Sequence, residues 1–243
     1  MPAQNEKNEV NPVAAAWRFG GLEWIFPPRC AVCGSVIPRT EVFCADCEKK
    51  FPHCPREFLL RSKTDGLNSP CIALFAYEGE LRSAVLAFKF RGFRGASRGF
   101  GIRMAQAVQG RVDMDFVVTF VPMDRSRRLE RGYNQAKLLA QEVASQLSLP
   151  CAPLLKKTRV TAQQHTLSRE KRRENAHGAF AAEKEAAGKN IVLCDDIVTT
   201  GETLRECVRV LRAAGAKSVI CAVIAYAGVE IGKKIDYNNS TGN

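Results

Sequence analysis

From residue 71 onward, apolar positions recur with two different periods, and each period predicts one kind of element. Short apolar runs, typical of strands buried in a sheet, predict strands at residues 71–77, 115–121, 190–195 and 217–225. Apolar residues three and four apart predict helices at residues 81–90, 96–108, 135–147 and 202–213. The alternation of strands and helices favours an α/β fold, in which a parallel sheet carries helices on both faces.

The rest of the chain divides into shorter segments. Residues 1–26 are expected to form a tail and a short packing segment, and residues 27–58 a small module dense in Cys and Pro. Residues 59–70 are polar and are interpreted as a linker to the main domain at residues 71–228. Residues 229–243 are expected to be a polar C-terminal tail. With 46% hydrophobic and 25% charged residues, the chain of 243 residues has a globular composition, which excludes general disorder.

Two pairs of cysteines indicate the chemistry of the module at residues 27–58. Each pair has C-x-x-C spacing, and the four residues are Cys30, Cys33, Cys44 and Cys47. Two such turns place four thiolates tetrahedrally around a structural zinc ion; the alternative is four unrelated cysteines. A third pair is broken, since Glu57 stands where a partner for Cys54 would be. A second metal site from His53, Cys54 and Cys71 nevertheless stays open.

The segment at residues 191–203 carries the most specific pattern in the chain: an apolar run, two acidic residues, two apolar residues and the sequence TTGET. In an open parallel sheet, ligands bind beyond the carboxyl ends of the strands, where a helix N-terminus favours phosphate. Asp195 and Asp196 suit the hydroxyl groups of a sugar beyond that phosphate, so the segment is expected to bind a ribose 5-phosphate. The expected phosphate contacts are Thr199, Thr200, Gly201, Glu202 and Thr203. The alternative is an ordinary strand, turn and helix with Asp or Thr as the helix cap.

Two basic segments precede this strand. The first, at residues 121–135, contains Arg125, Arg128 and Arg131, whose forked donors suit a second anion such as a diphosphate. The second, at residues 159–173, is expected to be a mobile loop that closes over a charged substrate. The candidate contacts in that loop are Gln163, His165 and Arg169.

Together, these segments resemble the ComF family of competence-related proteins, which includes the GntX-like proteins. The resemblance covers residues 30 to 227 and rests on the sequence RGYNQ at residues 131–135, GAF at residues 178–180, the acidic TTG loop and the cysteine-rich module. It implies a type I phosphoribosyltransferase-like domain behind a zinc ribbon. It also implies that 5-phosphoribosyl 1-pyrophosphate (PRPP) binds with Mg²⁺ and donates its phosphoribosyl group to an unknown acceptor, with Asp195 and Asp196 as the catalytic residues. Met123 and Asp124 depart from the second Val-Pro-type pair that the family often has, which puts the shape of the diphosphate loop in doubt.

Charge leaves a second function open. The formal net charge is +11, and basic residues concentrate at residues 82–103, 125–137 and 156–173, which fits either a phosphate-rich partner or a solvated face. The resemblance implies a link to DNA uptake, natural transformation and competence proteins, in which the chain handles single-stranded DNA and PRPP is an effector or relic. Aromatic residues among the basic ones suit either a stacking groove or the core, and they are Phe88, Phe90, Phe93 and Phe100. Neither a signal peptide nor a membrane span is expected, so the protein is assigned to the cytoplasm.

Overall fold

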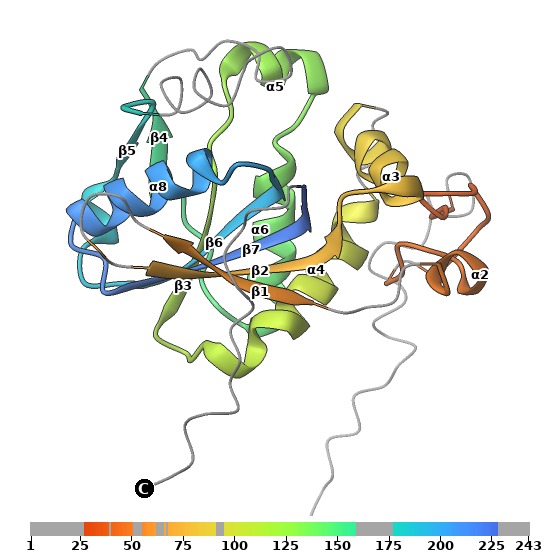
Figure 1. Cartoon of the computed structure of the whole chain (residues 1–243), viewed down its shortest axis with the longest axis horizontal. Helices are drawn as coiled ribbons and strands as arrows, with labels where there is room; N and C mark the ends of the chain where they lie inside the picture. Colours follow the sequence, from red (N-terminus) through yellow and green to blue (C-terminus); the bar gives the residue numbers. More distant parts are fainter. Residues whose placement is uncertain are drawn as a thin grey trace, which may run out of the picture.

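A central sheet of five strands organises the fold (Figure 1). The computed structural model describes residues 27–38, 40–50, 55–61, 66, 68–90, 95–158 and 177–227. The strands, in the spatial order β1-β2-β7-β6-β3, are β1 (Arg56–Arg61), β2 (Asn68–Ala76), β7 (Ser218–Tyr226), β6 (Asn190–Val198) and β3 (Phe116–Phe120). β1 pairs antiparallel with β2, whereas all other neighbours in this sheet are parallel. β4 (Leu155–Lys157) and β5 (Phe180–Ala182) form a separate antiparallel pair.

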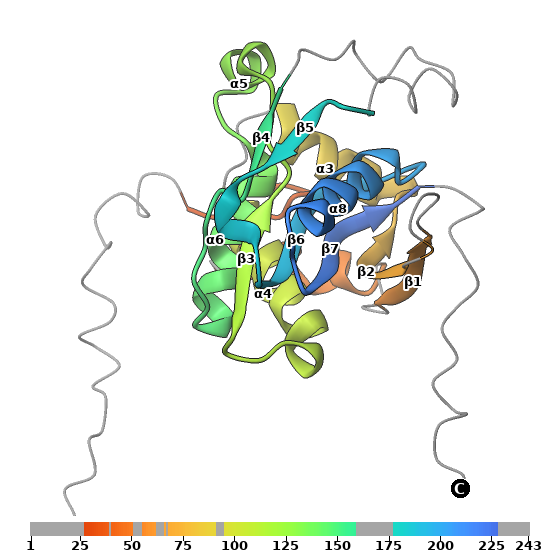
Figure 2. The same cartoon turned by 90° about the vertical axis from the view of Figure 1, so that its left-hand side faces the viewer.

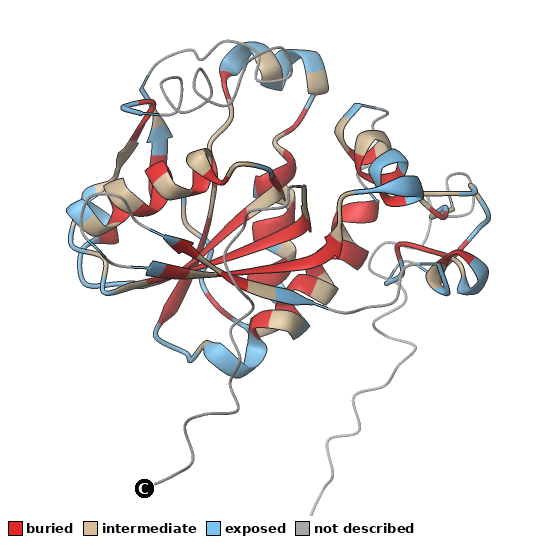
Figure 3. Ribbon diagram, in the orientation of Figure 1, coloured by how far each residue is buried: buried red, intermediate tan, exposed pale blue. Residues whose placement is uncertain are grey.

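Helices cover both faces of this sheet, as an α/β fold requires (Figure 2). α3 (Gly79–Phe90), α4 (Ala96–Val108) and α6 (Gln135–Leu147) bury their apolar residues on one face, and α8 (Glu202–Ala213) does so on the other. The short helical segments are α2 (Ala45–Glu48), η1 (Gln109–Arg111), α5 (Arg125–Arg131) and η3 (Lys184–Ala186). The central strands are therefore almost continuously buried (Figure 3). None of the described helices is long and apolar enough to cross a membrane.

Most of the predicted elements are confirmed, and β6 differs in an informative way. The helices predicted at residues 96–108, 135–147 and 202–213 have those bounds in the structure. The strand predicted at residues 190–195 continues to Val198, because Asp195, Ile197 and Val198 pair with β7. Asp195 and Asp196 therefore belong to a strand, where alternate residues point to opposite faces.

The interpretation of residues 59–70 as a linker is wrong. Residues 59–61 belong to β1 and residues 68–70 to β2, and the two strands pair from Arg56↔Ala73 to Arg61↔Asn68. β1 was interpreted as part of a polar segment because it is an edge strand whose three apolar residues are flanked by charged ones. Phe58 and Leu60 are nonetheless buried, in the alternation that a half-buried strand shows.

The cysteine module shares its core with the main domain. Val42 and Phe43 are buried, and the Phe43 ring lies 6.0 Å from that of Phe75 on β2 and 6.1 Å from that of Phe100 on α4. Arg103 on α4 also pairs with Glu48 of the module at 2.7 Å. The module, coloured orange in Figure 1, accordingly lies beside α3 and α4.

Gly99 on α4 is a packing point between the module and the main domain. A Cβ atom at Gly99 would lie 2.5 Å from Cγ2 of Val42 and 2.7 Å from the carbonyl carbon of Glu41. Gly99→Ala is therefore expected to lower the free energy of unfolding by about 1–3 kcal/mol, since overpacking forces the module away from α4. Gly95→Ala is the matched control, because a Cβ atom there has nothing within 4 Å. Urea unfolding measures the free energy of unfolding of both variants. Equal stability of Gly99→Ala and Gly95→Ala would contradict the close contact at Gly99.

Candidate functional site

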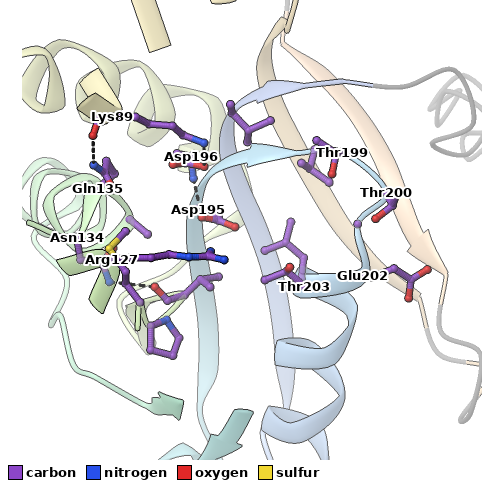
Figure 4. A pocket seen from close by; sticks show the side chains of 18 of the residues that line it. Lys89, Arg127, Asn134, Gln135, Asp195, Asp196, Thr199, Thr200, Glu202 and Thr203 are labelled. Carbon is purple, nitrogen blue, oxygen red and sulfur yellow. Dashed lines mark hydrogen bonds and ion pairs between the residues drawn. The ribbon is translucent and has the colours of Figure 1, made fainter. Parts of the chain in front are cut away.

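A cavity of about 300 Å³ lies beyond the carboxyl ends of β3 and β6, where parallel sheets bind ligands (Figure 4). Its lining comes from the end of β6, residues 199–204, the segment after β3, the start of α6, helix α3 and the β4–β5 pair. The predicted residues Asp195, Asp196, Thr199, Thr200, Gly201, Glu202, Thr203 and Arg131 all belong to this lining. The structure therefore brings together most of the residues predicted from two distant segments.

The TTG loop, residues 199–201, forms the wall of the cavity next to α8. Gly201 is the N-cap of α8, with a left-handed φ of 77°, and it has no side chain that could cap the helix. The alternative of Asp or Thr as the cap is therefore wrong, and the helix start is left open to an anion. Glu202 does not oppose this, because its carboxylate pairs with Arg205 at 3.0 Å. Arg205 also donates to the Thr200 carbonyl at 2.7 Å, which stabilises the loop.

Asp195 and Asp196 stand at the centre of the cavity but have different surroundings. Asp196 pairs with Lys89 of α3 at 3.0 Å, and both side chains are almost buried. The backbone N–H of Asp196 donates to Oδ1 of Asp195 at 2.8 Å. Burial, and then the charge of Asp196, raise the pKa of Asp195 to about 7, although Lys89 and Arg131 act in the opposite direction. The Asp196 carboxylate is thus paired with a lysine, while the Asp195 carboxyl titrates near neutral pH.

This raised pKa predicts that Asp195 lowers stability as the pH rises. The ordinary carboxyl pKa is 3.8, so between 3.8 and about 7 the folded chain holds one more proton at Asp195 than the unfolded chain does. Stability falls with pH wherever the folded state binds more protons. Asp195→Asn, which cannot ionise, is therefore expected to gain stability relative to wild type as the pH rises from about 4 to about 7. Urea unfolding across this range tests the prediction, and a difference that does not change with pH would contradict it.

The sequence RGYNQ at residues 131–135 acts as a clamp between α3, the segment after β3 and α6. The Tyr133 hydroxyl donates to the Phe88 carbonyl, and Nε2 of Gln135 donates to the Lys89 carbonyl at 3.1 Å. Nδ2 of Asn134 donates to the Val121 carbonyl at 3.1 Å, while its Oδ1 accepts from the N–H of Lys137 as the N-cap of α6. These bonds hold the end of α3 in place, and so they position Lys89 against Asp196.

Of the three arginines predicted to bind the diphosphate, only Arg131 lines the cavity. Arg131 lines the cavity, with its guanidinium 4.7 Å from the centre of the Phe90 ring, but Arg125 and Arg128 are exposed on α5 and do not. Arg127 lines the cavity instead, because it lies four residues before Arg131 and so shares that face of α5. The predicted loop contacts Gln163, His165 and Arg169 lie outside the described residues.

Sequence reasoning missed Lys89 and Lys157, two lysines of the cavity lining. Lys157 Nζ lies 2.7 Å from Oδ2 of Asp124, whose side chain is only 3% exposed. Burial lowers the pKa of Lys157, and the hydrogen bond to Asp124 acts in the opposite direction. Lys89 stands in a segment predicted as an ordinary helix, and Lys157 in one for which no element was predicted, so only their spatial neighbours reveal them.

The four predicted zinc ligands come together in the cysteine module. The Sγ atoms of Cys30, Cys33, Cys44 and Cys47 all lie within 4.8 Å of one another. The Cys33 and Cys44 Sγ atoms are 3.6 Å apart, close to the ~3.8 Å expected for thiolates about 2.3 Å from a tetrahedral zinc ion. The residues present therefore fit a structural zinc ion that closes the module.

Burial decides two alternatives that the sequence left open, a second metal site and an aromatic stacking groove. Cys71 cannot join a second metal site, because it is fully buried on β2 opposite Cys221, in the core of the sheet face that α8 covers. His53 and Cys54 lie outside the described residues. Phe88 and Phe100 are fully buried, so they belong to the core and not to a stacking groove. Phe90 is exposed, and Phe93 lies outside the described residues.

Comparisons with known proteins agree with the division into a cysteine module and a main domain. Residues 134–241 match the family model of the phosphoribosyl transferase domain, and residues 21–58 match that of the double zinc ribbon domain. The chain is 31% identical to DNA utilization protein YhgH of Escherichia coli over 193 residues, which cover 78% of this chain and 80% of that protein. It is 27% identical to Competence protein F of Haemophilus influenzae over 198 residues, covering 79% and 82%. It is 28% identical to Competence protein ComFC of Bacillus subtilis over 186 residues, covering 75% and 70%.

Proposed function

Because the chain belongs to the competence-related ComF family and carries its phosphoribosyl transferase domain, we propose that it binds PRPP and transfers the 5-phosphoribosyl group to an acceptor. One observation carries this proposal. The open start of α8 and the carboxylates of Asp195 and Asp196 line one cavity of about 300 Å³. Phosphate at one end and a diol at the other describe a ribose 5-phosphate, and the cations nearby suit the diphosphate of PRPP.

The lining residues divide the work of binding PRPP among three groups. The loop from Thr199 to Thr203 takes the 5-phosphate at the start of α8, while Asp195 and Asp196 accept hydrogen bonds from the ribose hydroxyl groups. Arg127, Arg131 and Lys157 take the diphosphate. Holding PRPP at both ends fixes the position of C1 of the ribose, which is where the reaction occurs.

Transfer breaks one bond at C1 and forms another. A lone pair of the acceptor forms the new bond to C1, and the C1–O bond to pyrophosphate breaks with its electron pair leaving on the pyrophosphate. The cations of the cavity stabilise the charge that develops on this leaving group. Mg²⁺ bound to the PRPP oxygens would supply further positive charge; apart from the four cysteines, no cluster of metal-binding side chains occurs in the part of the chain that the structure describes.

The direct test is a titration of the zinc-loaded protein with PRPP and Mg²⁺ by calorimetry. An assay of pyrophosphate release with candidate acceptors follows it. We expect one PRPP to bind per chain, and a productive acceptor to release pyrophosphate in proportion to the protein. If wild type does not bind PRPP, the proposed function is wrong. If PRPP binds but no acceptor yields pyrophosphate, PRPP acts as an effector.

A second candidate function is the handling of single-stranded DNA in the cytoplasm together with competence proteins. The relatives whose names mention DNA utilization and competence favour it, as does the net charge of +11. If Arg91, Arg94 and Arg98 contact the phosphates, their joint replacement by Ala should flatten the slope of log K against log salt by about 2 units.

Fluorescence anisotropy of a labelled oligonucleotide at several salt concentrations measures this slope. The matched control replaces Lys184, Lys189 and Lys217, which are exposed and lie next to the amino ends of β6 and β7, far along the strands from the cavity. An unchanged slope in the arginine variant, or an equal change in the control, would count against this route.

A further inference from the structure

One face of α3 turns toward the cavity, and the proposed function gives this face no role. Arg82, Leu86 and Lys89 are spaced by four and three residues, so they share one side of the helix, and all three line the cavity. Tyr77, which follows β2, lines it beside them. The buried side of α3 consists of Leu81, Ala84, Val85 and Phe88. The cavity-facing side is therefore separate from the side that packs in the core.

The α3 face forms a wall of the cavity distinct from the walls proposed to bind the 5-phosphate and the diphosphate of PRPP. The loop at residues 199–203 belongs to the β6–α8 side, whereas Arg127 and Arg131 come from α5. Lys89 connects α3 to the centre of the site through its ion pair with Asp196. Figure 4 shows Lys89 and Asp196 on one side of the cavity and Thr199, Thr200 and Glu202 on the other. An acceptor that attacks C1 needs such a wall next to the ribose.

The charges on this wall indicate what the acceptor carries. Lys89 is already paired with Asp196 at 3.0 Å, and Lys157 belongs to the group of cations that takes the diphosphate. Arg82 is exposed, and no acidic side chain of the described residues forms an ion pair with it. Leu86 and Tyr77 provide apolar surface next to this positive charge. A planar ring against Leu86 and Tyr77, with an anionic group near Arg82, would match all three side chains.

We propose that this face of α3 is the acceptor subsite and that the acceptor is a small ring compound with an anionic substituent, such as a heteroaromatic carboxylate. The proposal rests on the proposed phosphoribosyl transfer. A volume of about 300 Å³ is at the low end of the range for small-molecule sites. It suits a sugar phosphate with a single ring better than a polymer. The ring's lone pair forms the bond to C1, pyrophosphate leaves with the C1–O electron pair, and any proton on the attacking atom passes to water.

The test compares charged and uncharged rings of similar shape. Nicotinate against nicotinamide, and orotate against uracil, are titrated into protein saturated with ribose 5-phosphate, which provides no leaving group. We expect each carboxylate to bind at least about fivefold more tightly than its uncharged counterpart in wild type, as one partly exposed ion pair with Arg82 allows. Arg82→Gln should remove this preference. Arg61→Gln is the matched control, an exposed arginine at the end of β1 that does not line the cavity, and it should retain the preference.

Several outcomes would overturn the acceptor subsite. They are equal affinity for charged and uncharged rings, a preference that survives Arg82→Gln, no binding of any ring in the panel, or pyrophosphate release from PRPP with nucleic acid alone. The PRPP titration of wild type is measured separately. Its failure would remove the proposed function itself, whereas intact PRPP binding with no preference for anionic rings would remove only this inference.

Discussion

The double variant Asp195→Asn with Asp196→Asn is expected to bind PRPP at least about tenfold more weakly than wild type. Asn keeps the size of each side chain but removes two charged acceptors for the ribose hydroxyl groups. Hydrogen bonds to charged groups contribute about 1.5–3 kcal/mol each, so the loss of even one accounts for the tenfold change. The titration is best run near pH 8, because Asp195 titrates at about 7 and is ionised there.

The matched control for this variant is Asp113→Asn with Glu185→Gln, two exposed acids that do not line the cavity. It should bind PRPP as wild type does, which separates a local effect from a change in net charge. Thr200→Val removes one donor at nearly constant volume and should weaken binding to a smaller extent. If the double variant is folded and binds PRPP with unchanged affinity, the TTG loop and β6 do not form the site.

Loss of zinc is expected to destabilise the whole chain and not only the cysteine module. The module buries Val42 and Phe43 against β2 and α4, so its unfolding exposes part of the main core. Cys47→Ser removes a buried ligand and should lower the free energy of unfolding by at least about 3 kcal/mol, since metal binding is coupled to folding. The unfolding transition should shift as a single step, because the two parts share one core.

Elemental analysis and urea unfolding test this expectation together. Wild type purified without added metal should hold one zinc per chain, and Cys47→Ser should hold much less. Cys151→Ser is the matched control, because Cys151 is exposed and lies outside the module. Less than about half an equivalent of zinc in wild type, or equal stability of the two variants, would contradict a structural zinc site.

The sequence by itself determined the features that depend on neighbours along the chain. Helical periodicity is local, and so the bounds of α4, α6 and α8 could be predicted from it. The C-x-x-C spacing of the two cysteine pairs indicated one metal site, since each pair forms its own turn. The acidic TTG pattern predicted a strand up to Asp195 and a helix after Gly201, all within one segment, although the strand continues to Val198.

Only the tertiary structure decided which distant residues complete the site. Lys89 and Lys157 reach the cavity because α3 and β4 fold over the end of the sheet, and the local sequence of neither segment specifies that position. On α5, four arginines are close in sequence, but the orientation of the helix turns Arg127 and Arg131 inward and leaves Arg125 and Arg128 in solvent. Cys71, left open by the sequence as a ligand of a second metal site, was excluded by the face of β2 on which it lies. The physical reason is common to these cases: contacts between distant segments depend on how helices and strands pack, and a pattern along one segment holds no record of its partner.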